Sequence, residues 1–510
     1  MAVQLPPSPY SFAAGTAASV GLVLLYCVSR GIYNAFFHPL RHFPGPKLWS
    51  TTFLFRHVAA MRGQLDWSIK AFHDKYGDVV RFSPDELSFS SEQAWKDIYG
   101  HRDVPLVKDP GWYSIVKGPG GAQSIFNAGP QSHPRMRKQL SHAFSEKALR
   151  DQEDYVKTYV ELLIHKLRDV ASAGAPADMV KWYNFTTFDM IGDLALGKTF
   201  GCLKDSQYHT WVSNIFNSIK IGPFIRTMAA YTDVQSLMRL LAPASVKEAR
   251  RKHELYVEVH AKERMDKGIM EERKDFISYI LKHREDKNSL TDNEIAANCG
   301  FLILAGSETT ATALSGLTYH LLKVPDCLHK VTEEVRSAFS SEEEINFLNA
   351  NARLPYTMAC ISEGLRMYPP GPSLLPRRTP SGGASIIDGC QVPGWTLVGV
   401  HALTTTRKPA NFHKPNTFIP ERWLPSSTAD PSSPFYHDRR GASQPFSTGP
   451  RNCLGKSLAY NEMRVILAKL LWNFDLELCS ESKDWDNQLT YTLWEKRPLM
   501  CRLHDVRKGE

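Results

Sequence analysis

One ten-residue segment near the C-terminus constrains the fold more than any other part of this chain. Residues 446–455 read Phe-Ser-Thr-Gly-Pro-Arg-Asn-Cys-Leu-Gly, which places Cys453 in a loop rich in Gly and Pro. Apolar residues at helical spacing follow from Lys456 to Trp472, so Cys453 is predicted to lie just before a helix. Free N–H groups and the helix dipole at such a position favour a thiolate. Gly455 would let the backbone, or a flat molecule, approach closely.

The same segment follows the pattern Phe-x-x-Gly-x-Arg-x-Cys-x-Gly. A lone cysteine before a helix is usually a small buried side chain, but five matched positions in ten residues are harder to explain in that way. The segment resembles the haem-binding loop of the cytochrome P450 family, the haem-thiolate monooxygenases. The resemblance implies that Cys453 is the axial ligand of the haem iron, where a thiolate favours O–O cleavage. It also implies that Arg451 contacts a haem carboxylate.

The resemblance sets the expected fold as well. A chain of 510 residues would by length alone suggest three or more domains, whereas the family has one large unit. We therefore expect a mainly α-helical fold with small β-sheets, in which a long central helix lies over the haem. The residues themselves also predict a β-hairpin from strands at 79–82 and 87–89, a capping box at 291–294 and a final β-element at 494–503. One N-terminal transmembrane helix precedes it. The expected division is a membrane anchor at 1–30, a basic and proline-rich hinge at 31–47 and a catalytic domain at 48–510.

The N-terminal segment has the composition of a membrane anchor. Residues 1–29 contain no charged side chain, and residues 11–29 would span about 28 Å as a helix, close to the hydrocarbon thickness of a bilayer. Arg30, Arg41 and Lys47 follow, so the positive-inside rule places the body in the cytoplasm. A cleaved signal peptide is the alternative, but the basic n-region is missing. The sequence predicts a single-pass protein, expected in the endoplasmic reticulum, whose catalytic domain faces the cytoplasm.

Charge and cysteine usage exclude several other classes. The net charge of +8 is modest for this length, and no dense Lys/Arg run indicates nucleic acid as a partner. The nine cysteines are odd in number, widely spaced and without a Cys-x-x-Cys pair, which argues against a disulfide framework or a zinc site. The body is therefore expected in a reducing compartment.

A second informative stretch, residues 291–323, predicts a helix about 50 Å long. Its middle is apolar on nearly all sides but contains Ala-Gly-Ser-Glu-Thr at 305–309. A buried carboxylate is costly unless it is paired or used. The simplest alternative is a threonine that hydrogen-bonds to its own helix, with a kink at Gly306. The segment also resembles the oxygen-binding motif of the family, which implies that Thr309 hydrogen-bonds bound oxygen and that Glu308 relays protons.

Two further family motifs concern structural charges. Glu363 and Arg366 lie three residues apart in a predicted helix, 354–367, and Arg422 follows in Pro-Glu-Arg-Trp. Such a spacing is common on any helix surface. The resemblance to Glu-x-x-Arg and Pro-x-Arg nevertheless implies that the three charges form a buried network, in which the loss of one member leaves the others unpaired.

Several side chains are candidates for the haem propionates. The family commonly has Trp-x-x-x-Arg in the helix that opens near residue 133, and this chain has His133 and Arg137 at those positions. Arg377 is the preferred second contact, with Arg378 beside it. Considered alone, the basic cluster around Arg137 would be a solvated helix face.

The resemblance implies a monooxygenase with haem b that inserts one oxygen atom of O₂ into a lipophilic small molecule. The chain has no flavin or nicotinamide motif, so NADPH-derived electrons are expected from a membrane-bound cytochrome P450 reductase, with cytochrome b5 as a further candidate. Arg135, Lys138 and Lys456 could form a basic docking face, although solvated surface charge is the simpler interpretation. The segment Phe-Ile-Pro-Glu-Arg-Trp resembles filamentous-fungal members that act in secondary metabolism, such as trichothecene-type hydroxylases.

Two other functions stay open at the level of sequence. One is a haem-thiolate isomerase or dehydratase that does not use O₂, and the other is a non-enzymatic haem binder in the membrane. Glu308 and Thr309 argue against both, because neither function needs an acid beside an alcohol. The isomerase hypothesis predicts that Thr309→Ala retains turnover.

Overall fold

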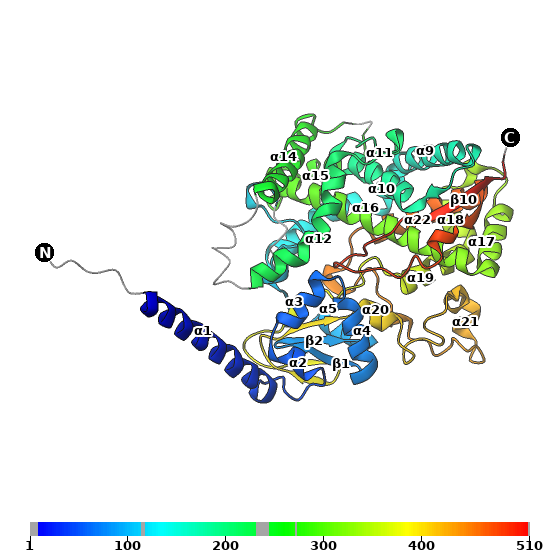
Figure 1. Ribbon diagram of the computed structural model, residues 1–510. Helices are drawn as coiled ribbons and strands as arrows, with labels where there is room; N and C mark the ends of the chain where they lie inside the picture. The colour runs from blue at the N-terminus through cyan, green and yellow to red at the C-terminus, as the bar shows by residue number, and fades with distance from the viewer. Residues whose placement is uncertain (1–8, 114–117, 231–243, 271–272, 508–510) are drawn as a thin grey trace.

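The computed structural model describes residues 9–113, 118–230, 244–270 and 273–507. Parts of three expected segments lie outside these residues: 1–8 of the anchor, 114–117 of a loop that precedes His133, and 508–510 of the catalytic domain. The described chain is mainly α-helical with three small β-sheets, as expected. Figure 1 shows a larger helical region above a smaller region that contains the largest of the three sheets.

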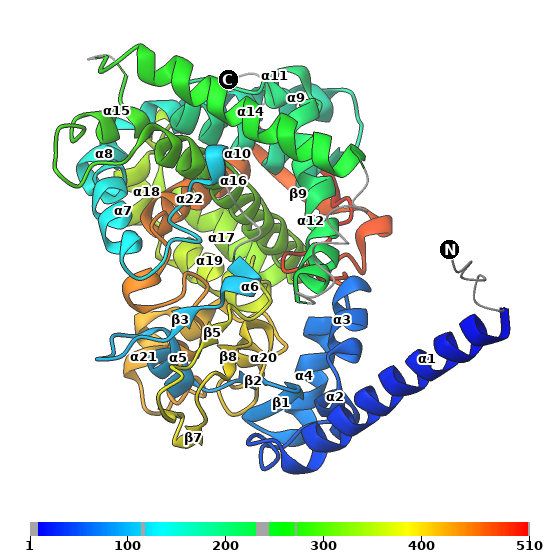
Figure 2. The same ribbon diagram turned by 90° about the vertical axis from the view of Figure 1, so that its left-hand side faces the viewer.

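Helix α16 (Asp292–Lys323) crosses the interior of the helical region (Figure 2). The capping box predicted at its start is present. The Thr291 hydroxyl accepts a hydrogen bond from the Glu294 backbone N–H, and the Glu294 carboxylate accepts one from the Thr291 backbone N–H. Because α16 is apolar on nearly every side, other helices surround it. They are α10 (Met179–Leu196), α14 (Ala244–Asp266), α19 (Pro355–Met367) and α22 (Lys456–Asn473).

The largest sheet joins three distant parts of the chain, in the strand order β1-β2-β8-β5-β3. The predicted hairpin forms from β1 (Val79–Ser83) and β2 (Glu86–Phe89), and β8 (Leu397–Val400) adds parallel to β2. At the other edge, β5 (Arg377–Arg378) pairs antiparallel with β3 (Val107–Lys108), so Lys108 lies opposite Arg377. The sheet thereby brings together two cations that are far apart in the sequence.

The C-terminal tail departs from expectation. A β-element was predicted from Trp494 to Leu503, but β10 begins only at Met500 and runs to Asp505. Before it, the Trp494 indole donates to the Pro369 carbonyl at 2.8 Å and stacks on Tyr368. Trp494 also forms a single antiparallel bridge with Thr490, so between Trp494 and Leu499 the segment has one isolated bridge and no named strand. β10 pairs on either side with β4 (Ala177–Asp178) and β9 (Phe474–Leu478), and β6 (Ser385–Ile387) pairs with β7 (Cys390–Val392).

The N-terminal helix α1 (Pro9–Ile32) continues into a π-helical turn at Tyr33–Phe37. It projects away from the folded body in both views (Figure 1 and Figure 2). Ala17–Phe37 is long and apolar enough to cross a membrane. The helix therefore extends past the expected anchor boundary at residue 30 and ends where His38-Pro39 stops it.

The remaining described helices have the following bounds: α2 Lys47–Thr51, α3 Leu54–Met61, α4 Leu65–Tyr76, α5 Glu92–Tyr99, α6 Pro110–Tyr113, α7 Ser132–Ser141, α8 Glu146–Asp151, α9 Glu153–Ser172, α11 Cys202–Asp205, α12 Thr210–Ala230, α15 Phe276–Leu281, α17 Pro325–Ala338, α18 Phe347–Arg353, α20 Ala402–Thr406 and α21 Pro425–Ala429.

Candidate active site

Cys453 lies in the loop between a 3₁₀ turn (Gly449–Arg451) and α22, as the sequence predicted. Its backbone N–H donates to the Phe446 carbonyl at 2.9 Å, which closes the loop. Gly449 has φ = +73°, and a Cβ there would lie 2.0 Å from the Tyr99 carbonyl oxygen. The glycine in the motif is therefore required by a close backbone approach. Cys453 itself keeps accessible surface on the loop, although protein atoms surround the thiol closely enough to desolvate it in part.

The electrostatics of Cys453 differ from the expected preference for thiolate. Burial among surrounding atoms raises the pKa of the thiol, and this effect outweighs the Gly455 N–H and the positive charges of Arg137 and Lys456, which lower the pKa. The helix N-terminus alone does not make Cys453 a thiolate. A bound metal ion would, because a coordinating thiol is deprotonated outright.

A group of cations gathers near this loop. Arg137, on α7, donates from Nη1 to the Asn452 carbonyl at 2.8 Å, and Arg451 donates to the Ala128 carbonyl at 2.9 Å. Arg377 donates to the Tyr113 hydroxyl at 2.7 Å. Among the described residues, none of these three guanidinium groups forms an ion pair with a carboxylate.

Lys108 is a fourth member that sequence analysis missed. Burial, followed by the charges of Arg377 and Arg451, lowers the pKa of Lys108 to about 6. Its ammonium lies 4.7 Å from the Tyr113 ring centroid, and it too lacks an acidic partner in the described part of the chain. The only signal that could have found it is the pairing of β3 with β5, which local sequence patterns do not contain.

His133 lies beside the same group and is buried. Burial and then the charges of Arg451, Lys108 and Arg137 lower the pKa of His133 to about 3, so the ring is neutral at pH 7. It can therefore offer a hydrogen bond to an anion but no charge. Arg378 points elsewhere: it forms a 2.8 Å ion pair with Asp109, because neighbouring strand residues face opposite sides.

These donors fit a flat cofactor that carries carboxylates and accepts a sulfur ligand. Arg137, Arg377 and Arg451 supply positive charge without a counter-charge from the described protein, which is costly unless an anion binds. Lys108 is mostly neutral at pH 7 with its pKa of about 6, and a bound anion would favour its charged form. Cys453 offers an accessible sulfur close to Arg137. The donor set is that of a site for haem, whose propionates are anionic.

One stripe of α16 shares the interior with this site. Phe301, Ala305 and Thr309 repeat at four-residue spacing, so they lie on one face, and each remains partly accessible although most of the helix is buried. The Thr309 hydroxyl donates to the Ala305 carbonyl at 2.6 Å. This is the hydrogen bond to its own helix that was the simplest alternative for the threonine. Thr309 nevertheless keeps accessible surface on the stripe.

The Glu308 carboxylate is paired in a way that the sequence did not indicate. Its Oε1 lies 2.7 Å from the Lys496 ammonium, and both side chains are almost completely buried. Lys496 also donates to the Thr312 hydroxyl at 2.8 Å, while Glu308 Oε2 is buried without a hydrogen-bond partner. Burial lowers the pKa of Lys496, and Glu308 opposes that change. A residue from the C-terminal tail therefore balances the buried acid of α16.

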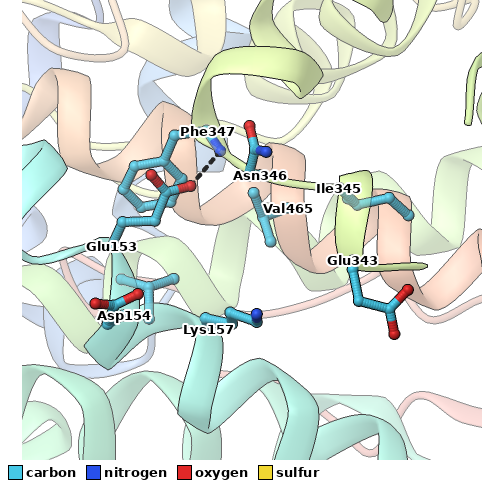
Figure 3. A pocket seen from close by; sticks show the side chains of 9 residues that line it. Glu153, Asp154, Lys157, Glu343, Ile345, Asn346, Phe347 and Val465 are labelled. Atoms are coloured by element: carbon cyan, nitrogen blue, oxygen red, sulfur yellow. Dashed lines mark hydrogen bonds between the residues drawn. The ribbon is translucent and has the colours of Figure 1, made fainter. Parts of the chain in front are cut away.

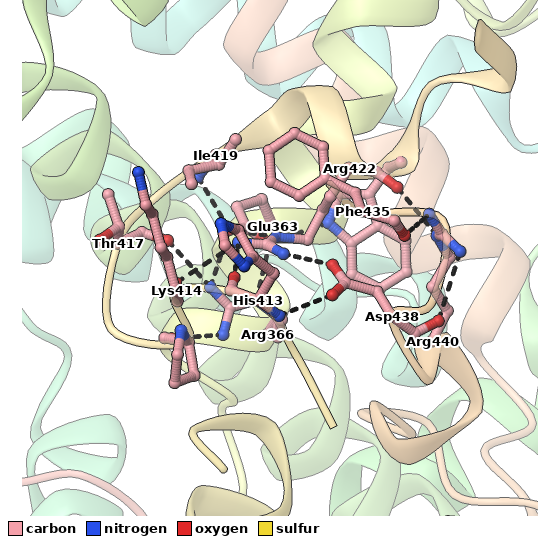
Figure 4. Close-up of polar contacts among 12 residues, drawn as sticks. Glu363, Arg366, His413, Lys414, Thr417, Ile419, Arg422, Phe435, Asp438 and Arg440 are labelled. Carbon is pink, nitrogen blue, oxygen red and sulfur yellow. Dashed lines mark hydrogen bonds and ion pairs between the residues drawn. The ribbon is translucent and has the colours of Figure 1, made fainter. Parts of the chain in front are cut away.

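The predicted structural charges come together around Glu363 (Figure 4). Arg366 makes two bonds to this carboxylate, at 2.8 and 2.7 Å, and Arg422 adds a third at 3.1 Å. The Ile419 backbone and the Trp423 indole also donate to it, and Arg422 pairs in addition with Asp438. Burial alone would raise the pKa of Glu363, but Arg366 and Arg422 hold it below its usual value.

A second buried acid, Glu462, lies on α22 and contacts α16. One oxygen accepts from the Thr310 hydroxyl at 3.1 Å, and the other has no hydrogen-bond partner. Burial raises the pKa of Glu462 to about 8, so its carboxyl group is mostly protonated at pH 7. No sequence motif singles out this residue.

We expect Glu462→Gln to make the protein more stable at pH 8 and nearly unchanged at pH 5. The folded pKa of about 8 lies above the ordinary 4.5, so the contribution of Glu462 to stability is greatest below pH 4.5 and falls until about pH 8. The gain at pH 8 should be on the order of a few kcal/mol. Thermal unfolding at both pH values measures it, with exposed Glu333→Gln as the control. Equal effects at the two pH values would contradict the assignment.

Two cavities lie away from Cys453. The larger, about 170 Å³, is a crevice between α9, the segment before α18, and α22 (Figure 3). Its lining contains none of the predicted site residues. The smaller cavity is lined by Arg226 and Trp112, among other residues.

Of the three residues expected to form a basic docking face, Arg135 is paired with Glu294, so only Lys138 and Lys456 remain available for docking.

The fold and the donor set fit a haem enzyme in which a cysteine would bind the iron. The chain belongs to the cytochrome P450 family: the family model matches residues 43–502. It is 48% identical to a trichothecene C-4 hydroxylase of Trichoderma arundinaceum over 97% of this chain and 98% of that one. It is 45% identical to the cytochrome P450 monooxygenase olcB of Penicillium canescens, over 95% and 97% of the two chains. The chain is thus a P450 monooxygenase, as its motifs indicated.

Proposed function

We propose that this P450 oxidises a lipophilic small molecule of fungal secondary metabolism, by hydroxylation or a related insertion of one oxygen atom from O₂. Three arginines without a counter-charge among the described residues, together with Lys108 and the accessible Cys453, carry the proposal, because they fit the propionates and the iron of haem b. A trichothecene without a C-4 hydroxyl group is the first substrate to test, given the relative from Trichoderma arundinaceum.

Haem, when bound, supplies the activation of O₂ and the oxidation of the substrate. Cys453 would hold the iron, while Arg137, Arg377, Arg451 and Lys108 would hold the propionates and so fix the orientation of the cofactor. His133 adds a neutral hydrogen bond.

The acid and the alcohol of α16 have distinct tasks. Thr309 presents a hydroxyl from the accessible stripe, and Glu308 is the buried acid that exchanges protons behind it. Lys496 holds the Glu308 carboxylate in place through the 2.7 Å ion pair, which makes it a positioning residue.

The electrons come from NADPH through a cytochrome P450 reductase, with cytochrome b5 as a second candidate donor. The apolar α1 helix supports a single-pass anchor in the endoplasmic reticulum, with residues 48–510 as a catalytic domain on the cytoplasmic side. Lys138 and Lys456 remain as basic residues for docking the reductase.

We expect Thr309→Ala to uncouple NADPH consumption from product formation, so that NADPH is consumed with less product formed. Loss of the hydroxyl removes a positioned proton donor, a contribution of about 100-fold or more. Product per NADPH should fall and hydrogen peroxide should rise, measured in a reductase-supported assay with the trichothecene substrate. Thr309→Ser, which keeps the hydroxyl, is the matched control. Unchanged turnover in Thr309→Ala would favour an isomerase or dehydratase and refute the proposal.

We expect Lys496→Met to destabilise the protein by about 3–5 kcal/mol, because the Glu308 carboxylate is left buried without its cation. Adding Glu308→Gln should recover part of this loss, since the uncompensated charge is then absent. Denaturant unfolding of the two single variants and the double variant measures the coupling. A double variant no more stable than Lys496→Met would show that the pair is not coupled.

A further inference from the structure

The smaller cavity has a volume of about 50 Å³ and lies between segments that are distant in the sequence. Helices α3, α4, α6 and α12 line it together with the tail residues Thr490–Thr492. A single water needs about 10–15 Å³ by this kind of measure, so the cavity has room for a small polar group but not for a whole substrate.

Arg226 is the charged group in this cavity that lacks a full set of partners. Its guanidinium carbon lies 4.3 Å from the centroid of the Trp112 ring, and Nη1 donates to the Thr492 hydroxyl. Among the described residues, no atom forms a hydrogen bond with its buried Nε and no carboxylate pairs with its guanidinium group. Burial, then the charge of Arg56, lowers the pKa of Arg226 to about 10, so the group stays charged at pH 7. An unpaired buried donor on a cation is costly.

The other charged groups around the cavity are already paired. Asp66 accepts from Ser373 at 2.6 Å through one oxygen and lies 3.1 Å from His401 Nε2 through the other. Arg56 donates from Nε to Glu86 at 3.0 Å. An anion that entered the cavity would therefore find Arg226 available and no unpaired acid to repel it among these side chains.

A row of aromatic rings leads from this cavity to α16. The ring centroids of Trp112 and Tyr113 are 4.5 Å apart, those of Tyr113 and Phe126 are 5.1 Å apart, and Phe126 stacks on Phe301 at 4.8 Å. Phe301 belongs to the same helical stripe as Thr309. An apolar molecule that follows this row would run from Arg226 toward the proposed site of oxidation.

We propose that Arg226 binds a carboxylate at one end of the substrate, so that this enzyme selects lipophilic molecules that carry an anionic oxygen group. The carboxylate would accept from Nε of Arg226 and lie over the edge of Trp112, while the apolar body extends along the aromatic row. The inference rests on the proposed monooxygenase function and adds a chemical class to its substrate.

The test uses the full-length, haem-loaded enzyme in detergent and three probes with equal chains: dodecanoate, dodecan-1-ol and dodecyl phosphate. Binding is followed by the shift of the haem absorption band and by calorimetry, neither of which needs turnover. We expect dodecanoate to bind more tightly than dodecan-1-ol, and Arg226→Gln to weaken dodecanoate about tenfold to a hundredfold without affecting the alcohol. Arg251→Gln, on the exposed face of α14, is the matched control.

Two outcomes would overturn the inference. One is equal binding of dodecanoate and dodecan-1-ol to the wild type, or an equal loss of both in Arg226→Gln. The other is Arg226-dependent binding of dodecyl phosphate and of anionic phospholipid vesicles with no response to dodecanoate, which would assign the cavity to a lipid headgroup. If Thr309→Ala still separates NADPH consumption from product formation, only this inference fails and the proposed function stands.

Discussion

Cys453→Ala is expected to abolish both the thiolate signature of the haem and product formation. No other thiol lies in the loop between the 3₁₀ turn and α22, so the variant has no sulfur to replace the ligand. The wild-type protein, reduced and exposed to carbon monoxide, should show an absorption band strongly red-shifted from that of histidine-ligated haem. The variant should lack this band and lose more than about 100-fold of its activity, since even residues that only support a ligand cost 10–100-fold.

Cys390→Ala serves as the control, because Cys390 is partly exposed on β7, away from the loop. It should keep the red-shifted band. If the wild type binds haem but lacks that band, a residue other than Cys453 holds the iron. If the band survives in Cys453→Ala, the ligand is likewise another residue. Either result would remove the basis for assigning the cluster of cations to propionates.

The elements that could be predicted were those with a strong local signal. Helix α16 begins and ends as expected, because its capping box and apolar middle are readable within one stretch of sequence. The hairpin β1–β2 and helix α22 were likewise predicted from alternating or helical apolar spacing. Family membership followed from motifs that are short and fixed in order, and the comparison with the family confirmed it.

The residues that could not be predicted act across long separations in the sequence. Lys496 reaches Glu308 only because the tail, held by Trp494, lies against α16. Lys108 reaches Arg377 only because β3 pairs with β5. No pattern within either segment specifies its partner, so single-sequence reasoning sees an ordinary lysine in each case.

Cys453 illustrates a different limit. The position of Cys453 before a helix correctly indicated that the N–H groups and the helix dipole favour the thiolate. The competing effect, burial in a low-dielectric surrounding, raises the pKa of the thiol further than those groups lower it. The balance depends on the packing around the sulfur, which the sequence does not contain.

Glu363→Ala is expected to cost the protein about 3–5 kcal/mol of unfolding free energy. The substitution leaves the Arg366 and Arg422 guanidinium groups fully buried without the carboxylate that both of them bind. Arg422 keeps Asp438, whereas Arg366 keeps only uncharged partners among the described residues: the carbonyls of Thr406, Pro415 and Thr417, at 2.7, 2.6 and 3.1 Å, and the Met367 sulfur. Against a typical stability of 5–15 kcal/mol, this loss leaves part of the protein unfolded or without haem. Denaturant unfolding followed by circular dichroism measures it.

The pH dependence of the same variant distinguishes a lost charge from a lost contact. The folded pKa of Glu363 lies below its ordinary value of 4.5, so its contribution is present above that pH and disappears as the pH falls through the folded pKa. Glu363→Ala should therefore lose most at neutral pH and show a flatter acid limb than the wild type. Glu344→Ala breaks an exposed 3.1 Å pair with Arg353 and should cost at most about 1 kcal/mol. If the two variants lost equal stability, the buried network would contribute no more than a surface ion pair, because burial is what makes the unpaired arginines costly.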